Sequence, residues 1–168
     1  MEINSNTLAA QFRATTDTLI GLLEAFTPET FNRKPSPAAW NAGDVAEHLL
    51  LFDIRLQEIL ATATEPANRN PTEKTAEYTA RVTNREARLD APPFLVPAAT
   101  ERTAAEMIAK LQTARNKIIA SIETQDLSLI STAFPHRFFG EMTAFEWIHF
   151  LDLHTHRHIL QLRELLAE

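Results

Sequence analysis

The sequence contains no cysteine among its 168 residues. Disulfides, cysteine-ligated zinc sites and a cysteine nucleophile are therefore excluded, and any thiol chemistry needs a thiol from another molecule. Only three glycines are present, which argues against sheets joined by tight turns and against a glycine-rich loop that cradles phosphate. The chemistry of this chain must therefore rest on other side chains.

Positive charge and long apolar runs are also scarce. The formal net charge is -6, whereas nucleic-acid binding needs clustered lysine and arginine. No apolar run approaches the roughly 18 residues of a membrane span. The segment MEINSNTLAA lacks the basic and apolar parts of a secretory signal. We therefore expect a cytoplasmic protein with neither a nucleic-acid nor a membrane partner.

Length and composition favour one globular domain. With 168 residues, of which 45% are hydrophobic and 23% charged, the chain can bury a substantial core without disulfides. The polar, proline-rich stretch at 62–99 is alternatively a linker between two domains, but neither half would then hold a complete core. The sequence thus predicts a single domain over residues 1–168.

Apolar residues at helical spacing predict four long helices. Asn4 or Ser5 caps the first helix and Asn41 caps the second, while Thr143 and Glu146 form a capping box that starts the last. The stretch at 72–89 is expected to form a short surface helix on a crossover. The sequence therefore predicts an all-α fold, a four-helix bundle with a long crossover connection between the second and third core helices. The core helices are expected at about 5–25, 42–61, from 103 to before a connector at 126–141, and 143–168.

The last predicted helix carries four of the six histidines. At about 100° of rotation per residue, His154 and His158 fall on the apolar stripe that contains Trp147. His149 and His156 project to the opposite side, where solvent or a partner would lie. Two histidines one turn apart can hold one transition metal, although two hydrogen-bonded histidines at the edge of the core explain the same spacing.

A third histidine lies at the edge of the apolar stripe of the second helix. His48 follows Asp44 by one turn, and one interpretation is a boundary histidine paired with that carboxylate. Together with His154 and His158, it completes a set of three imidazole ligands with one open position, which is typical of a catalytic metal site. Asp44 is then available as the acceptor that orients His48.

No residue is identified from the sequence as a general base. Asp44, Glu47 and His136 are candidates, and a structural role is the favoured alternative for each. Three phenylalanines of the connector accompany His136, and we favour packing at the end of the bundle over ligand recognition for this aromatic cluster. Its members are Phe134, Phe138 and Phe139.

Two segments of the chain resemble the DinB-like family of metal-dependent enzymes, which includes the bacillithiol transferases and the mycothiol-dependent maleylpyruvate isomerase. The first segment runs from Trp40 to His48, and the second contains His154-x3-His158 followed by Gln161. The resemblance implies a four-helix bundle, often a homodimer, in which three histidines bind a divalent metal, commonly zinc or nickel. Carried over residue by residue, the metal ligands are His48, His154 and His158.

The residues around these motifs indicate a divergent branch of the family. Ile159-Leu160-Gln161 stands where many members have Arg-Gly-Gln, and Asn41 follows Trp40 where serine or threonine is common. The resemblance implies a small-molecule substrate and transfer of a low-molecular-weight thiol to an electrophile. Metal-assisted hydrolysis, and a non-catalytic bundle that binds a ligand or is purely structural, are the alternatives.

Overall fold

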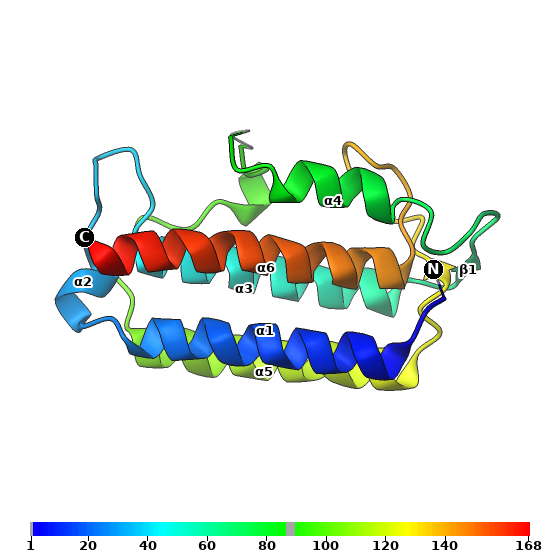
Figure 1. Cartoon of the computed structure of the whole chain (residues 1–168), viewed down its shortest axis with the longest axis horizontal. Helices are drawn as coiled ribbons and strands as arrows, with labels where there is room; N and C mark the ends of the chain where they lie inside the picture. The colour runs from blue at the N-terminus through cyan, green and yellow to red at the C-terminus, as the bar shows by residue number, and fades with distance from the viewer. Residues whose placement is uncertain (1, 87–89) are drawn as a thin grey trace.

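The computed structural model describes residues 2–86 and 90–168 and is mostly helical (Figure 1). Four of its helices are long and make up the bundle, whereas the others belong to the connections between them. The elements in chain order are α1 (Ser5–Glu24), α2 (Pro28–Asn32), α3 (Ala42–Ala61), β1 (Glu65–Pro66), α4 (Thr75–Thr83), η1 (Pro93–Leu95), α5 (Ala104–Thr124), β2 (Leu129–Ile130) and α6 (Ala144–Ala167).

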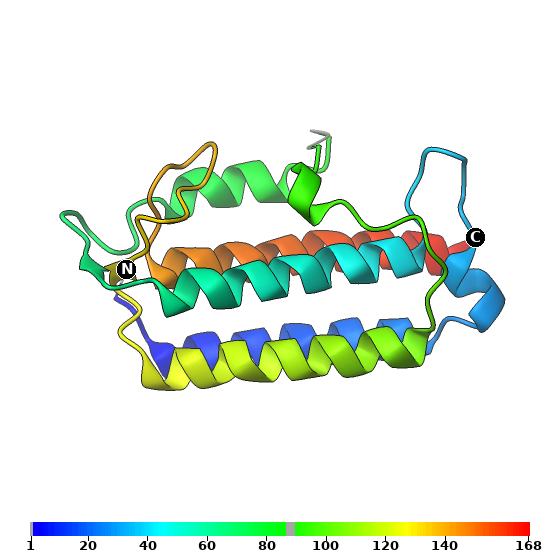
Figure 2. The ribbon, with the colours of Figure 1, turned by 180° about the vertical axis from the view of Figure 1, so that it is seen from behind.

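The four long helices form a bundle in which α1 and α3 each pack against both α5 and α6. Helices α1 and α6 run in one direction, and α3 and α5 run in the other (Figures 1 and 2). Because α3 and α5 are parallel neighbours, the chain must return along the whole bundle between them, and α4 and η1 lie on that return. The predicted four-helix bundle with a long crossover is confirmed.

The predicted helix starts are confirmed by side-chain caps. Asn4 accepts a hydrogen bond from the Thr7 amide at the start of α1. Asn41 and Asp44 form a reciprocal capping box at the start of α3. These caps satisfy amide groups that have no partner within the helix.

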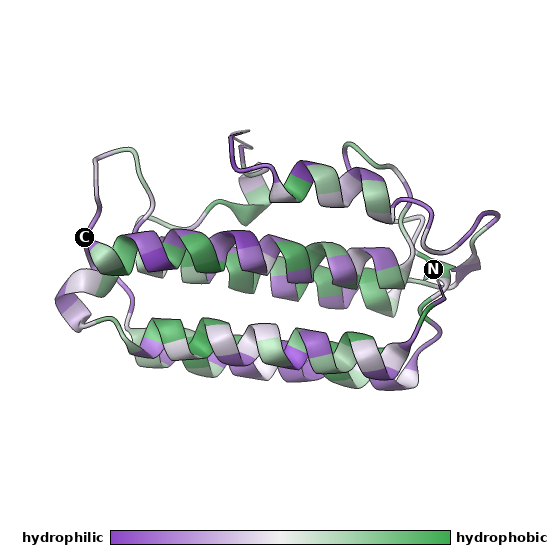
Figure 3. Ribbon diagram, viewed as in Figure 1, coloured by the Kyte–Doolittle hydropathy of each residue, from purple (hydrophilic) through white to green (hydrophobic). Residues whose placement is uncertain are grey.

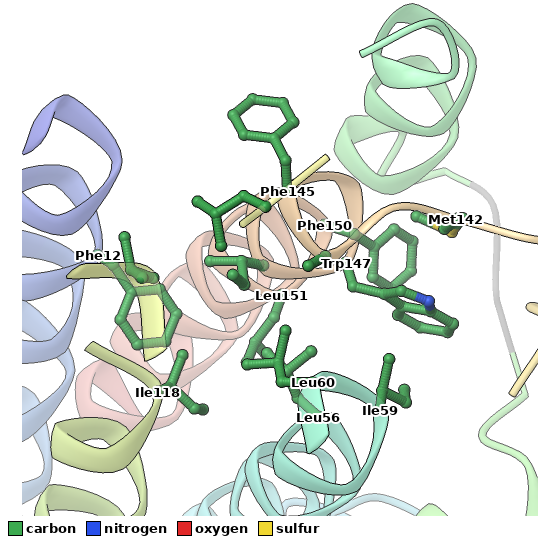
Figure 4. Packing of buried hydrophobic residues seen from close by; sticks show 14 of the residues in the cluster. Phe12, Leu56, Ile59, Leu60, Ile118, Met142, Phe145, Trp147, Phe150 and Leu151 are labelled. Atoms are coloured by element: carbon green, nitrogen blue, oxygen red, sulfur yellow. The ribbon is translucent and has the colours of Figure 1, made fainter. Parts of the chain in front are cut away.

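The core fills the space between the four long helices. Phe12, Leu56, Ile118 and Leu151 are buried and come from α1, α3, α5 and α6 respectively (Figure 4). Hydrophilic residues alternate with hydrophobic ones along the helices (Figure 3), as expected of amphipathic helices with one face on a core. Burial of these apolar faces stabilises the bundle and holds α3 beside α6.

A charged pair lies inside the bundle, and the apolar periodicity did not indicate it. The Arg115 Nε donates to Asp53 Oδ2 at 3.0 Å, and both side chains are fully buried. Arg115 also donates to the hydroxyls of Thr16 and Thr155, so the cluster joins all four core helices. Burial raises the pKa of Asp53 to about 6, although the Arg115 charge and hydrogen bond act in the opposite direction.

Helix α4 packs on α6 and covers part of it. Tyr78 and Val82, one turn apart, are buried on the inner face of α4. The Tyr78 hydroxyl lies 2.8 Å from Nδ1 of His149. The prediction that His149 faces solvent or a partner is therefore wrong, because the crossover of the same chain covers it, whereas His156 is exposed. The helix predicted at 72–89 is shorter than expected, and residues 87–89 lie outside the described ones.

The crossover is fixed at the start of α6 by a buried carboxylate. Glu146 completes the predicted capping box with Thr143, and it also accepts two hydrogen bonds from Arg69 and one from the Lys74 amide.

Nearby, β1 and β2 form a two-stranded antiparallel sheet. The sheet was not predicted, because strands of two residues carry no usable periodicity. No helix in the described part of the chain is both long and apolar enough to span a membrane.

Candidate metal centre

The structure brings the three histidines of the sequence prediction together between α3 and α6. Nε2 of His154 lies 2.9 Å from Nε2 of His48 and 3.1 Å from Nε2 of His158. Tetrahedral ligands at zinc–nitrogen distances of 2.0–2.1 Å are separated by about 3.3 Å. Two of the three nitrogen pairs are therefore close to the spacing that a single ion requires, and all three nitrogens lie within 4.8 Å of one another.

The partners of the outer two rings determine which nitrogen carries hydrogen. Nδ1 of His48 donates to the Leu95 carbonyl at 2.7 Å, and Nδ1 of His158 donates to Gln161 Oε1 at 2.9 Å. In a neutral imidazole the other nitrogen then bears a lone pair. His154 can donate one hydrogen to only one of these two lone pairs. The other lone pair is left facing a ring nitrogen without a hydrogen between the two atoms. A cation among the three Nε2 atoms would remove this repulsion, so the donor set fits a metal ion.

The electrostatic setting keeps the three rings neutral at pH 7. Burial lowers the pKa of His158 to about 3, with a smaller contribution from His48. Burial also lowers the pKa of His154, to well below its ordinary value, and that of His48. Imidazole binds a metal only in its neutral form, so these shifts favour ligation over protonation.

The prediction that Asp44 orients His48 is wrong. Its carboxylate accepts hydrogen bonds from the Asn41 amide at 3.2 Å and from Arg102 at 3.1 Å. The acceptor for His48 is instead the Leu95 carbonyl in η1. The His48 ring reaches across to the crossover rather than back along its own helix, so the one-turn spacing to Asp44 does not produce a contact.

Glu47 takes part in the same network as Asp44. It forms an ion pair with Arg102 and accepts a hydrogen bond from the Ala98 amide at 2.7 Å. These contacts fasten the end of the crossover to α3. Neither Asp44 nor Glu47 is among the described residues that line the cavity beside the histidines.

A partly enclosed cavity of about 250 Å³ lies beside the three histidines, which form part of its lining. Phenylalanine and tryptophan form the largest group among the other lining residues. Two phenylalanines of the connector contribute to it, so the interpretation that this cluster only packs the end of the bundle is incomplete. The aromatic lining consists of Trp40, Phe52, Phe94, Phe138, Phe139, Trp147 and Phe150.

His136 also lines the cavity, and its hydrogen bonds define its chemistry. Nδ1 accepts from the amides of Phe138 at 3.2 Å and Phe139 at 3.3 Å, so the hydrogen of the neutral ring is on Nε2. Burial, followed by the charges of Arg137 and Arg81, lowers the pKa of His136 to about 4. A ring with this tautomer and pKa is a hydrogen-bond donor at neutral pH rather than a general base.

The lowered pKa of His136 makes the stability of the fold depend on pH. In the unfolded chain His136 becomes protonated below its ordinary pKa of 6.5, whereas in the folded protein it stays neutral until about pH 4. Stability is therefore fully present above pH 6.5 and falls as the pH decreases toward 4. Relative to His136→Gln, the natural protein should lose about 1 kcal/mol more between pH 7 and 4.5, a value reduced for partial exposure of the ring. Urea unfolding at both pH values measures this difference, and equal losses would contradict it.

The hydrogen bond from His158 to Gln161 predicts a loss of metal affinity when the acceptor is removed. Partners of this kind fix the orientation of a ligand ring, and their loss costs roughly 10–100-fold in affinity. Gln161→Leu should therefore weaken zinc binding in a calorimetric titration, and Gln161→Glu, which keeps an acceptor, should weaken it less. Gln11→Leu on the exposed side of α1 is the matched control. Equal zinc affinities of Gln161→Leu and Gln11→Leu would contradict the positioning role.

Sequence reasoning missed the Leu95 carbonyl and the role of Gln161. The apolar run Pro93-Phe94-Leu95 within a polar crossover is a signal that this segment contacts the core. Gln161 follows His158 by three residues, a spacing at which helical side chains meet. The second contact was therefore readable from the sequence, whereas the first depends on where the crossover docks.

Comparisons with known proteins agree with this fold. A family model described as the DinB superfamily matches residues 11–162. The chain is 28% identical over 144 residues to the uncharacterized protein YuaE of Bacillus subtilis (strain 168), which covers 85% of this chain and 87% of that protein. It also resembles the crystal structure of TT2238, a four-helix bundle protein, with a TM-score of 0.58 and 19% identity over 98% of this chain and 100% of that one. Because the family match includes all three histidines and most of the sequence, the chain belongs to the DinB superfamily.

Proposed function

We propose that this protein is a metal-dependent transferase that moves a low-molecular-weight thiol onto an electrophilic small molecule. The observation that carries the proposal is the convergence of three imidazole nitrogens on the wall of an aromatic cavity. Zinc or nickel is the proposed ion. An ion held by His48, His154 and His158 supplies positive charge that favours a thiolate over a thiol at neutral pH.

The protein's own residues have three roles in this proposal. The histidines would hold the ion, and three protein ligands are the number typical of a catalytic metal site. The aromatic walls, including Phe52 and Phe150 beside His154, exclude water and so strengthen electrostatic interactions in the cavity. The Nε2–H of His136 is available to donate a hydrogen bond to the bound electrophile or its leaving group.

The overall reaction balances without an oxidant or reductant. The incoming thiol loses its proton to solvent, a sulfur–carbon bond forms, and the bond to the leaving group breaks as that group departs with its electron pair. Because the chain has no cysteine, no thiol of the protein competes with the incoming one. The same charge can activate water, so hydrolysis of the electrophile is the competing outcome.

A conjugation assay tests the proposal. Zinc-loaded protein is incubated with a panel of small thiols and 1-chloro-2,4-dinitrobenzene, and thioether formation is followed by absorbance. We expect the rate to exceed that of free zinc plus thiol, to fall after chelation and in His158→Ala, and to be retained in His156→Ala. No acceleration with any thiol would contradict thiol transfer, and formation of the hydroxylated product would favour hydrolysis instead.

A further inference from the structure

The cavity beside the histidines is lined by more positive than negative side chains, in a chain whose net charge is -6. Four arginines but only one carboxylate, that of Asp90, are among its described lining residues. The arginines are Arg55, Arg81, Arg137 and Arg157. The excess of positive charge in the cavity is therefore opposite in sign to the net charge of the protein.

Two of these arginines keep their charge available to a ligand. Several other arginines of the chain are paired with carboxylates, as Arg55 is with Glu58 at 2.7 Å and Arg85 with Glu164 at 2.6 Å. In the described part of the chain, Arg81 and Arg137 form no ion pair with a carboxylate. A bound anion would be their first opposite charge, so these two are the arginines that select for one.

Ring contacts place both of these guanidinium groups beside the same aromatic side chain. The Arg81 Cζ lies 3.8 Å and the Arg137 Cζ 4.3 Å from the centre of the Phe138 ring, in the range of cation–π contacts. Arg137 also donates to the Asp90 carbonyl at 3.2 Å. The two arginines come from α4 and from the connector before α6, and Phe138 gathers their charges at one edge of the cavity.

A continuous aromatic wall leads from the histidines to this charged edge. His154 stacks on Phe150, Phe150 contacts His136, and His136 contacts Phe138, with ring centres 6.1, 5.1 and 6.0 Å apart. Phe150 is 8% exposed and Phe138 is 47% exposed. The wall therefore runs from the interior to the surface, with the candidate metal site at its inner end and the two arginines at its outer end.

The geometry points to a substrate that is an amphipathic anion, with an apolar body against the aromatic wall and a carboxylate or similar group at the edge of the cavity that Arg81 and Arg137 line. A cavity of about 250 Å³ holds a phenyl ring and a short chain, since about 150 Å³ suffices for benzene. Charge-assisted hydrogen bonds from guanidinium groups favour carboxylates. The inference rests on the proposed function only in naming this ligand a substrate, because the arginine edge binds an anion with or without turnover.

Both tryptophans of the chain, Trp40 and Trp147, line the cavity, so intrinsic fluorescence reports directly on its occupation. Three probes share one body and differ in charge: 4-phenylbutyrate, 4-phenylbutanamide and 4-phenylbutylamine. They are titrated at about 50 mM salt, where charge effects are only partly screened. Each titration is run on zinc-loaded protein and on protein treated with a chelator, so that binding to the arginines is separated from binding to a metal.

We expect the carboxylate to bind about tenfold more tightly than the amide, and the amine most weakly, in both forms of the protein. The double variant Arg81→Gln/Arg137→Gln should reduce the preference for the carboxylate to within about twofold. Arg13 on α1 is exposed and paired with Glu123 on α5, so Arg13→Gln should leave the preference for the carboxylate unchanged.

Three outcomes would overturn the inference. One is equal affinity for the carboxylate and the amide, and another is the absence of binding by any of the three probes. The third is a carboxylate preference that disappears on chelation, which would place the carboxylate on the metal and leave the proposed function standing. Conversely, a charge preference that persists without metal supports the anion-binding edge even where the conjugation assay fails.

Discussion

Replacing His154 with alanine should weaken zinc binding by at least about a hundredfold, because it removes the nitrogen that lies between the other two. Nε2 of His154 is 2.9 Å from that of His48 and 3.1 Å from that of His158. The variant therefore keeps two of the three ligands and lacks the one that is near both. Competition titration against a chromophoric chelator measures the change.

His156→Ala on the same helix is the control for this variant. His156 lies two residues further along and its Nε2 is 3.0 Å from the Thr15 hydroxyl on α1, so it is outside the three-histidine cluster. Its removal should leave the zinc affinity within about twofold, as expected of a surface residue with no part in ligation. Equal losses in the His154 and His156 variants would show that the metal binds elsewhere.

Arg115→Met should destabilise the bundle by about 3–5 kcal/mol, because it leaves the Asp53 carboxylate buried without its partner. The pair Asp53→Leu/Arg115→Met should recover most of this loss, since two apolar side chains need no counter-charge. The hydroxyls of Thr16 and Thr155 keep acceptors of their own at Phe12 and Leu151. Urea unfolding of both single variants and the double variant gives the coupling energy, and additive losses would contradict the account.

The loss in Arg115→Met should also depend on pH. Burial already raises the pKa of Asp53 to about 6 in the natural protein, and removing the guanidinium takes away the charge that opposes this rise. The folded state then holds a proton that the unfolded state releases near pH 4. Stability is consequently lost as the pH rises through the folded pKa, so the variant should be closer to the natural protein at pH 5 than at pH 8.

The long helices were predictable from local sequence, whereas the packing of the connections was not. The apolar face of α1 and the capping boxes that begin α3 and α6 are each encoded within a few residues. By contrast, α4 docks on α6 through Tyr78 and Val82, the two large apolar side chains of a mostly polar helix. The predicted exposure of His149 was wrong because it depends on where α4 packs.

The candidate site was predictable to a similar extent. The helical positions of His48, His154 and His158 put their imidazoles on apolar faces, and the bundle places those faces together. Their hydrogen-bond partners divide by distance in the chain: Gln161 is one turn from His158, but Leu95 is 47 residues from His48. Asp44 was assigned to His48 on spacing alone, and the capping box and Arg102 occupy its carboxylate instead.

The arginines of the cavity illustrate the same limit. Arg81 lies on α4 and Arg137 in the connector before α6, and both contact the ring of Phe138. Nothing in either local segment distinguishes these arginines from the others of an acidic chain. Only the docking of two irregular connections against each other places their charges at one edge of the cavity.

The most direct test of the central proposal is the absorption spectrum of the protein loaded with cobalt(II), recorded before and after a small thiol is added. Cobalt(II) accepts the same nitrogen ligands as zinc, and its visible absorption reports on coordination number and ligand type. We predict intense visible bands from one ion per chain, and a new thiolate-to-cobalt charge-transfer band once the thiol enters the open position. A spectrum of free aqueous cobalt, or one that the thiol leaves unchanged, would contradict a three-histidine centre that activates a thiol.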